Sequence, residues 1–271
     1  MTNVDLSGRD PVLLEVEPPV AVVRLQDVTG RNRISGPLGD GLRAALGRAA
    51  AHPEVRAVVL EGLPDVFCAG GSADRMLGGH QQRVVEVWRF LRAVLDCPLP
   101  VVAAAQGHAL GGGFLLALYC DVAVLSASSR YAANFLTFGF TPTGGATWLL
   151  PTVLGRPLGT EMLYTSRSYR GQELADRGAG VRVVAHDRVA AEARATALRI
   201  AAAPRACLEE VKAQLAEPVR HAAEAALHRE TPAHEATVGT GEAAWRIRML
   251  HGERLRDRPT QADPVRPGSG S

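Results

Sequence analysis

The sequence predicts an α/β fold in which short strands alternate with helices, followed by a helical C-terminal region. Two patterns lead to this prediction. Apolar or alternating runs of strand length are separated by segments with helical spacing over the first two thirds of the chain. From about Val189 onward the pattern is helical and rich in alanine. The chain has 271 residues, 46% of them hydrophobic and 21% charged, which suits a large globular core.

The elements follow in order along the chain. Residues 12–16 and 20–25 flank Pro18-Pro19 and are apolar or alternating, which is typical of a hairpin. Beyond the hairpin we expect a helix over 38–51, a strand over 56–60, a helix over 84–95, a strand over 101–105, a helix over 112–119 and a strand over 121–125. This order implies repeated strand–strand–helix turns.

Domain boundaries follow from changes in composition. We expect a disordered N-terminus over 1–10, a core over 11–188, a helical region over 189–256 and a disordered tail over 257–271. The tail is rich in proline and ends in Gly-Ser-Gly-Ser, so it cannot bury enough apolar surface to stay ordered. Prolines at 204, 218 and 232 are expected to break the C-terminal helices.

Charge and cysteine content exclude several classes of protein. A formal net charge of +2 is too mild for a nucleic-acid-binding surface, and no apolar run is long enough to span a membrane. The N-terminus lacks the features of a signal peptide. No His, Cys or Asp cluster has metal-ligand spacing, so we expect no metal. Four scattered cysteines are expected to be buried thiols of a cytoplasmic protein: Cys68, Cys97, Cys120 and Cys207.

Two glycine-rich turns carry the strongest functional signal. Residues 66–71 are an apolar strand end that breaks into small residues, and residues 104–113 run from a strand into Gly111-Gly112-Gly113 and an apolar helix. A glycine run that opens a helix leaves backbone N–H groups without intrahelical acceptors, and the helix dipole adds positive charge there. Two such turns side by side can direct two N–H groups at one oxygen atom, which is an oxyanion hole.

These turns resemble the oxyanion motifs of the crotonase (enoyl-CoA hydratase/isomerase) superfamily. Residues 67–72 read Phe-Cys-Ala-Gly-Gly-Ser, similar to the family's Phe-x-Ala-Gly-Ala-Asp, and residues 107–113 read Gly-His-Ala-Leu-Gly-Gly-Gly, matching Gly-x-Ala-x-Gly-Gly-Gly. The resemblance implies a crotonase fold, which is a spiral of ββα turns, an acyl-thioester site and a homotrimer. It also implies that Gly71 and Gly112 are the oxyanion donors. The alternatives are a positive φ at Gly71 and close helix–strand packing at Gly112.

Both carboxylate positions of the family hydratases are apolar in this chain. The resemblance aligns them with Leu115 and Phe135, and no Asp or Glu occurs between Asp121 and Glu161. Hydration needs carboxylates to activate water and move a proton, so we exclude ordinary hydratase activity. Decarboxylation needs no external base, because loss of CO₂ supplies the electron pair, and an enzyme carboxylate beside the departing one would repel it.

A second resemblance points to the same reaction. Residues 131–142 read Tyr-Ala-Ala-Asn-Phe-Leu-Thr-Phe-Gly-Phe-Thr-Pro, similar to crotonase-like proteins of polyketide β-branching, which decarboxylate a glutaconyl-type chain on an acyl carrier protein. The resemblance implies an acyl carrier protein as partner, a thioester on phosphopantetheine or CoA, and no other cofactor. It places Leu115, Asn134 and Phe135 at the substrate.

A C-terminal histidine of the same subgroup corresponds to His234. An imidazole proton can move near neutral pH, so His234 is the candidate general acid. The alternative is a partly solvated surface histidine, as is common on helices; His221 and His228 lie in the same region.

Four further residues are candidates for binding anionic groups. Arg75 and His80 follow Gly71 and can face the substrate carboxylate, which an arginine matches in fork geometry. Arg31 and Arg33 occupy the family segment that helps hold the nucleotide end of CoA, and can pair with phosphates of CoA or of phosphopantetheine. For all four, the alternative is a solvated or helix-capping side chain.

Two other readings remain open. One is an enoyl isomerase or a combined dehydratase–decarboxylase acting on the same class of thioester. The other is a catalytically silent scaffold of a synthase complex, which would have no need to keep both glycine motifs.

Overall fold

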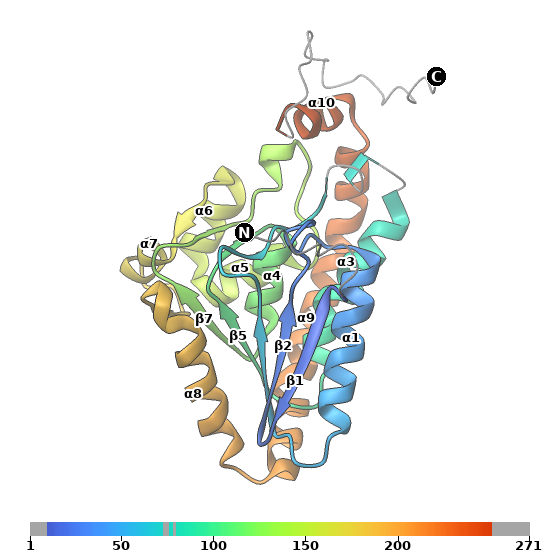
Figure 1. Ribbon diagram of the computed structural model, residues 1–271. Coiled ribbons are helices and arrows are strands. Elements are labelled where there is room, and N and C mark those ends of the chain that lie inside the picture. Colours follow the sequence, from blue (N-terminus) through green and yellow to red (C-terminus); the bar gives the residue numbers. More distant parts are fainter. Residues whose placement is uncertain (1–9, 73–75, 78–79, 251–271) are drawn as a thin grey trace, which may run out of the picture.

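The strands of the protein form two sheets, and both put strands from successive turns of the chain side by side (Figure 1). The computed structural model describes residues 10–72, 76–77 and 80–250, with only the backbone at 80–83. The larger sheet has the order β1-β2-β3-β5-β7-β10 and the smaller β4-β6-β8-β9. The strands are β1 Val12–Glu17, β2 Val20–Leu25, β3 Ala57–Glu61, β4 Val66–Cys68, β5 Val101–Ala105, β6 His108–Leu110, β7 Val122–Ser126, β8 Arg130–Ala132, β9 Tyr169–Arg170 and β10 Arg182–Val184.

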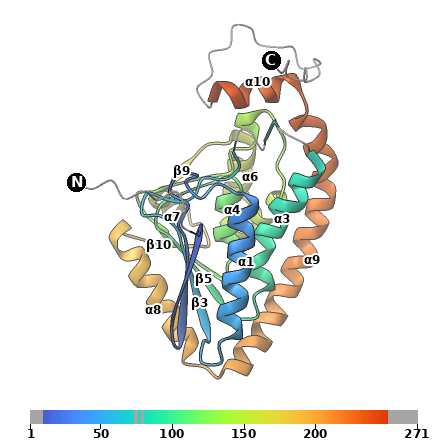
Figure 2. The same ribbon diagram turned by 45° about the vertical axis from the view of Figure 1, so that its right-hand side comes forward.

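Helices lie on both faces of the larger sheet, and others pack outside them. The α helices are α1 Gly36–Ala51, α3 His80–Asp96, α4 Gly112–Tyr119, α5 Ala146–Leu154, α6 Arg156–Thr165, α7 Gly171–Asp176, α8 Val189–Ala201, α9 Arg205–Val238 and α10 Gly241–Leu250. Alternate residues of β2 and β3 face opposite sides: Ala21 and Val58 join the core under α1 and α3, whereas Val20 and Ala57 pack under α8. Figure 2 shows α8 alone on one side of the sheet and α1, α3 and α9 on the other.

After the β1–β2 hairpin, which lies in the larger sheet, each turn of the chain adds one strand to each sheet. β3 and β4 precede α3, β5 and β6 precede α4, and β7 is followed by β8. Neighbouring strands of successive turns are parallel, as in β3–β5, β5–β7 and β4–β6. The predicted α/β fold of repeated ββα turns with a helical C-terminal region is therefore confirmed.

The expected breaks at Pro218 and Pro232 are wrong, because α9 runs through both prolines without interruption. A proline inside a helix frees the carbonyl four residues earlier. The residues concerned, Gln214 and His228, are exposed, so water can take the place of the lost donors. The opposite side of α9 is held by burial of Ala216, Ala223, Ala226 and Glu230. The break at Pro204 is correct, since Pro204 separates α8 from α9.

The predicted disordered tail 257–271, and all but the last residue of the predicted disordered segment 1–10, lie outside the described residues. Within the described ranges, no helix has both the length and the apolar character that crossing a membrane requires.

Candidate active site

The two glycine turns meet because they follow neighbouring parallel strands. β4 pairs with β6, Cys68 opposite Ala109, and each strand ends directly before its turn. Gly70 allows the two turns to approach each other closely. Its φ is +78°, and a Cβ there would lie 2.6 Å from the carbonyl oxygen of Leu110. Only glycine tolerates both conditions. The topology thus places the two turns in backbone contact at one edge of the smaller sheet.

Two backbone N–H groups at this edge are available to a ligand. Gly112 is the first residue of α4, where an N–H has no intrahelical acceptor. No backbone acceptor in the described parts of the chain pairs with the N–H of Gly112 or Gly71. Gly71 and Gly112 line the same cavity, which has a volume of about 290 Å³. Both glycines with these N–H groups are therefore at one cavity.

The alternative explanations for these glycines apply to their neighbours. The positive φ belongs to Gly70 and Gly111, and Gly71 has none. Close helix–strand packing belongs to Gly113, where a Cβ would lie 2.2 Å from the carbonyl oxygen of Cys68. A Cβ on Gly112 would meet only the tip of the Ile34 side chain, at 2.5 Å.

The structure brings together most of the residues that the sequence singled out. Those that line the cavity are Gly71, Gly112, Leu115, Asn134, Phe135, His234, Arg31 and Arg33. Arg75 lies outside the described residues; His80 begins α3, but its side chain is not described.

The inner wall of the cavity is apolar at the positions where family hydratases carry carboxylates. Leu115 is fully buried on α4, and Phe135 is 7% exposed. Phe138 and Phe140 stack with ring centroids 5.8 Å apart, and Phe135 meets Phe140 edge-on at 6.4 Å. Neither Leu115 nor Phe135 can accept a proton.

His234 reaches the cavity from α9. Its ring lies edge-on to Phe140 with centroids 5.2 Å apart, and its Nδ1 is 2.7 Å from the carbonyl oxygen of Thr141. Because a carbonyl only accepts hydrogen bonds, Nδ1 carries the hydrogen, and Nε2 is the nitrogen that can exchange a proton. His221 and His228, on the same helix, are exposed and do not line the cavity.

A buried carboxylate fixes α9 one turn before His234. Glu230 is 5% exposed and accepts hydrogen bonds from the backbone N–H of Gly145 at 2.8 Å and of Thr147 at 2.7 Å, and from the Thr147 hydroxyl at 2.6 Å. These donors stand at the start of α5, whose first N–H groups have no intrahelical acceptors. Glu230 therefore caps α5 and holds α9 against the cavity.

The sequence did not point to three other polar residues of the cavity: Glu86, Thr143 and His108. Glu86 lies on α3, upstream of both family carboxylate positions. The sequence pattern that could have indicated it is an acidic residue between Val84 and Val87 on an apolar helix face. His108 accepts a hydrogen bond at Nδ1 from the backbone N–H of Arg130, at 3.0 Å. A carboxylate thus lies in the cavity, from a different part of the chain than the family positions.

Arg31 and Arg33 flank a buried asparagine that fixes their loop. The Asn32 side chain donates to the carbonyl oxygens of Leu25 and Phe67, both at 3.0 Å, so the loop is tied to β4 beside the first glycine turn. Arg31 is exposed and pairs with Asp65 at 3.1 Å. Arg33 is half-buried, and no acidic side chain among the described residues forms an ion pair with it.

The remaining candidate groups are not suited to nucleophilic chemistry. Burial raises the pKa of Cys68, next to the first turn, to about 12, so its thiol stays protonated. Cys97 and Cys120 are also buried, but Cys207 is exposed, contrary to the prediction. Lys212 is 3% exposed and pairs with Asp121 at 2.6 Å, and neither residue lines the cavity.

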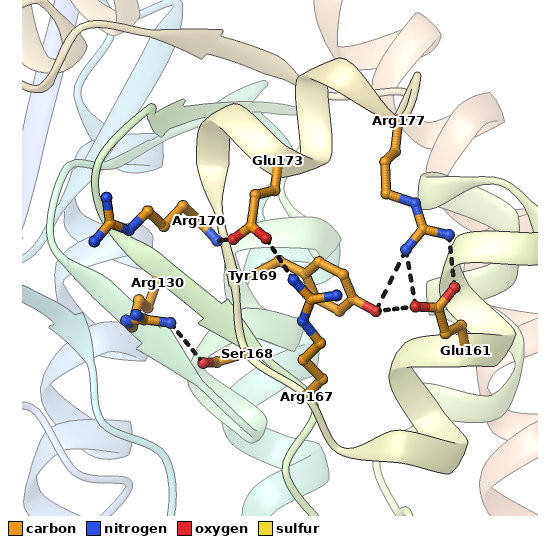
Figure 3. A network of polar contacts seen from close by, with 8 residues as sticks. All are labelled: Arg130, Glu161, Arg167, Ser168, Tyr169, Arg170, Glu173 and Arg177. Carbon is orange, nitrogen blue, oxygen red and sulfur yellow. Dashed lines mark hydrogen bonds and ion pairs between the residues drawn. The ribbon is translucent and has the colours of Figure 1, made fainter.

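A second polar network lies on the surface around α6, β9 and α7, and none of its residues lines the cavity (Figure 3). Arg177 and Tyr169 both donate hydrogen bonds to Glu161, at 2.6 Å and 2.6 Å, and these bonds lower the pKa of Glu161 to about 2. The network fastens α6 to β9 and α7.

Comparison with known proteins agrees with this geometry. Residues 15–249 match the family described as Enoyl-CoA hydratase/isomerase. The bacillaene synthase decarboxylase PksI of Bacillus subtilis is 36% identical over 242 residues, covering 89% of this chain and 97% of the relative. The ECH2 decarboxylase domain of CurF from Lyngbya majuscula is 33% identical, with a TM-score of 0.81, covering 89% of this chain and all of that domain.

A third similarity is to a structure from a dehydratase/decarboxylase enzyme couple involved in polyketide β-branching. It is 35% identical, with a TM-score of 0.83, and covers 90% of this chain and 100% of that chain. The chain therefore belongs to the enoyl-CoA hydratase/isomerase family, among the crotonase-type decarboxylases of polyketide β-branching.

Proposed function

We propose that this decarboxylase acts on a glutaconyl-type acyl thioester carried on an acyl carrier protein. One observation carries the proposal: two glycine N–H donors and His234 line the same cavity as Leu115 and Phe135, which replace the hydratase carboxylates. Oxyanion stabilisation and proton donation are thus provided, while the two family bases are missing.

The electrons for the reaction come from the substrate itself. The bond between the carboxylate carbon and the acyl chain breaks, CO₂ leaves, and the electron pair moves through the conjugated chain to the thioester oxygen. The resulting dienolate is stabilised by the N–H groups of Gly71 and Gly112, which are aimed at this oxygen before the charge develops. Removing one donor of such a pair typically costs about 100- to 1000-fold in rate.

His234 then supplies the proton that the dienolate needs. In the charged imidazole, Nδ1–H stays on the carbonyl of Thr141 while Nε2–H is donated to carbon. The ring returns to the neutral form with its hydrogen on Nδ1, the form that the Thr141 carbonyl selects.

The apolar wall favours the forward reaction. A carboxylate in surroundings such as Leu115, Phe135 and Phe140 is poorly solvated, whereas CO₂ is neutral and has no such penalty. Exclusion of water also strengthens the interaction between the oxyanion and its two donors.

The carrier and the assembly belong to the same proposal. In this proposal Arg33, and Arg31 once released from Asp65, pair with the phosphate of phosphopantetheine or of CoA, and both arginines line the cavity. The thioester arm is then the only group required besides the protein, with no other cofactor. A homotrimer follows from the family resemblance, and the unpaired cysteines favour the predicted cytoplasmic location.

Mass spectrometry of a glutaconyl-carrier protein after incubation with the enzyme tests the proposal. A loss of mass equal to CO₂ is expected. A tight complex with an unchanged carrier mass would instead support a silent scaffold and contradict the proposal.

Glu86 favours one second candidate, a combined dehydratase–decarboxylase, because its carboxylate lines the cavity and could assist removal of water. Incubation with a hydroxyglutaryl carrier separates the two functions. Loss of water from this carrier would support the combined activity, and an unchanged hydroxyglutaryl carrier would support decarboxylation alone.

A further inference from the structure

Several polar groups of the loop between η1 (Leu136–Phe138) and α5 are hydrogen-bonded to neighbouring helices. Phe140 and Thr143 of this loop line the cavity, and its hydrogen-bond partners come from α4 and α9. The bonds are Thr141 N–H to Thr237 Oγ1 at 3.0 Å, His234 Nδ1–H to Thr141 O at 2.7 Å, Tyr119 O–H to Gly144 O at 2.8 Å, and Gly145 N–H to Glu230 Oε2 at 2.8 Å. The loop is therefore held from both sides.

The side chain of Thr143 has no such hydrogen bond. Its side chain is 7% exposed and lines the cavity, yet its buried Oγ1 has no hydrogen-bond partner among the described residues. Buried hydroxyl groups are almost always hydrogen-bonded, because burial without a partner is unfavourable. A group that enters the cavity is the natural partner.

Thr143 lies in a closely packed part of the loop. Pro142 precedes it, and Gly144 and Gly145 follow with φ of +75° and +76°. The loop is tightly packed at this point, since a Cβ on Gly144 would lie 2.8 Å from Leu91 and 3.2 Å from Leu115. The hydroxyl is thus preorganised beside the apolar wall.

We propose that the Thr143 hydroxyl donates a hydrogen bond to the substrate carboxylate that leaves as CO₂. This inference rests on the proposed function, in which the thioester oxygen is already bound by Gly71 and Gly112. The carboxylate is then the polar group of the acyl chain that still needs a donor. Glu86 also lines the cavity, but an ionised carboxylate cannot donate a hydrogen bond.

A neutral hydroxyl suits this role better than a cation. An arginine fork would stabilise the full negative charge of the carboxylate, and that stabilisation would be lost as the charge moves to the thioester oxygen. A single hydroxyl orients the carboxylate with a smaller stabilisation of the ground state. Thr143 therefore acts as a substrate-binding residue that selects carboxylated acyl chains.

The test compares Thr143→Val, which keeps the shape and removes the hydroxyl, with Thr143→Ser, which keeps the hydroxyl. The kcat/KM for the glutaconyl carrier is expected to fall about 10- to 100-fold in Thr143→Val, as for loss of a hydrogen bond to a charged group, and to recover in Thr143→Ser. The Kd for the decarboxylated carrier should change less than about twofold in both, because that product lacks the carboxylate.

Thr152→Val is the matched control, since Thr152 is exposed on α5 and does not line the cavity. Thermal unfolding of each variant shows that it is folded. Wild-type kcat/KM in Thr143→Val would overturn the inference alone, and so would an equal loss of affinity for substrate and product. Absence of CO₂ release by the wild type would instead overturn the proposed function, and this inference with it.

Discussion

Gly113→Ala tests whether the contact between the two glycine turns sets the oxyanion hole. Gly113 is the second residue of α4, and the added Cβ would lie 2.2 Å from the carbonyl oxygen of Cys68, the last residue of β4. An ordinary contact begins near 3.4 Å, and the obstacle is backbone, so no side chain can rotate away. The start of α4 and the end of β4 must therefore separate by about 1 Å.

This separation moves the N–H of Gly112 relative to that of Gly71. A misplacement of about 1 Å in a catalytic geometry costs roughly 100-fold in rate, similar to removal of one oxyanion donor. We expect kcat for CO₂ release to fall about 100-fold in Gly113→Ala, with a much smaller change in KM because most cavity contacts remain. Steady-state kinetics with a glutaconyl carrier measures both constants.

Gly47→Ala is the matched control for the same chemical change in a helix. Gly47 is exposed within α1, and a Cβ there meets no atom within 4 Å. This variant should keep full activity. Its free energy of unfolding should be about 0.5–1 kcal/mol higher than that of the wild type, because alanine favours the helix. A Gly113→Ala protein that is folded and releases CO₂ at the wild-type kcat would refute the reasoning.

Three further predictions concern groups around the cavity and on the surface. His234→Ala should lower kcat for product formation about 100-fold or more, whereas His228→Ala, on the exposed side of α9, should leave kcat unchanged; equal rates would remove His234 as the general acid. Glu230→Ala should lower the free energy of unfolding by about 3 kcal/mol in urea titrations, because it leaves donors at the start of α5 unpaired, and a loss below about 0.5 kcal/mol would contradict the capping role. Hydrogen bonds from Arg177 and Tyr169 lower the pKa of Glu161 from 4.5 to about 2, so their stabilisation is present above pH 4.5 and is lost as the pH falls through about 2. Glu161→Gln should therefore flatten the stability–pH curve between these two values, and an unaltered curve would contradict the assignment.

Local chemistry explains which parts of the fold and site could be predicted. The strand over 101–105 and the helix over 112–119 agree with β5 and α4 at both ends, because an apolar run and a glycine start define them within the sequence. The resemblance of the two glycine turns to the oxyanion motifs of the crotonase family likewise predicted that they meet, and the β4–β6 pairing brings them together.

The unpredicted features depend on contacts between distant segments. The helix α9 continues through Pro218 and Pro232 because residues on its opposite side are buried. This burial cannot be recognised from the local sequence pattern. Glu86 and Thr143 enter the cavity only because α3 and the loop before α5 pack around α4.

The most direct test of the central claim is CO₂ release by Glu86→Gln. If the electrons come from the breaking carbon–carbon bond and the charge rests on main-chain N–H groups, no acidic side chain is needed as a base. Since Glu86 is the described acidic residue that lines the cavity, its amide variant should release CO₂ from a glutaconyl carrier within about threefold of the wild-type rate. A folded Glu86→Gln protein with a rate lowered about 100-fold or more, as for loss of a general base, would contradict the account.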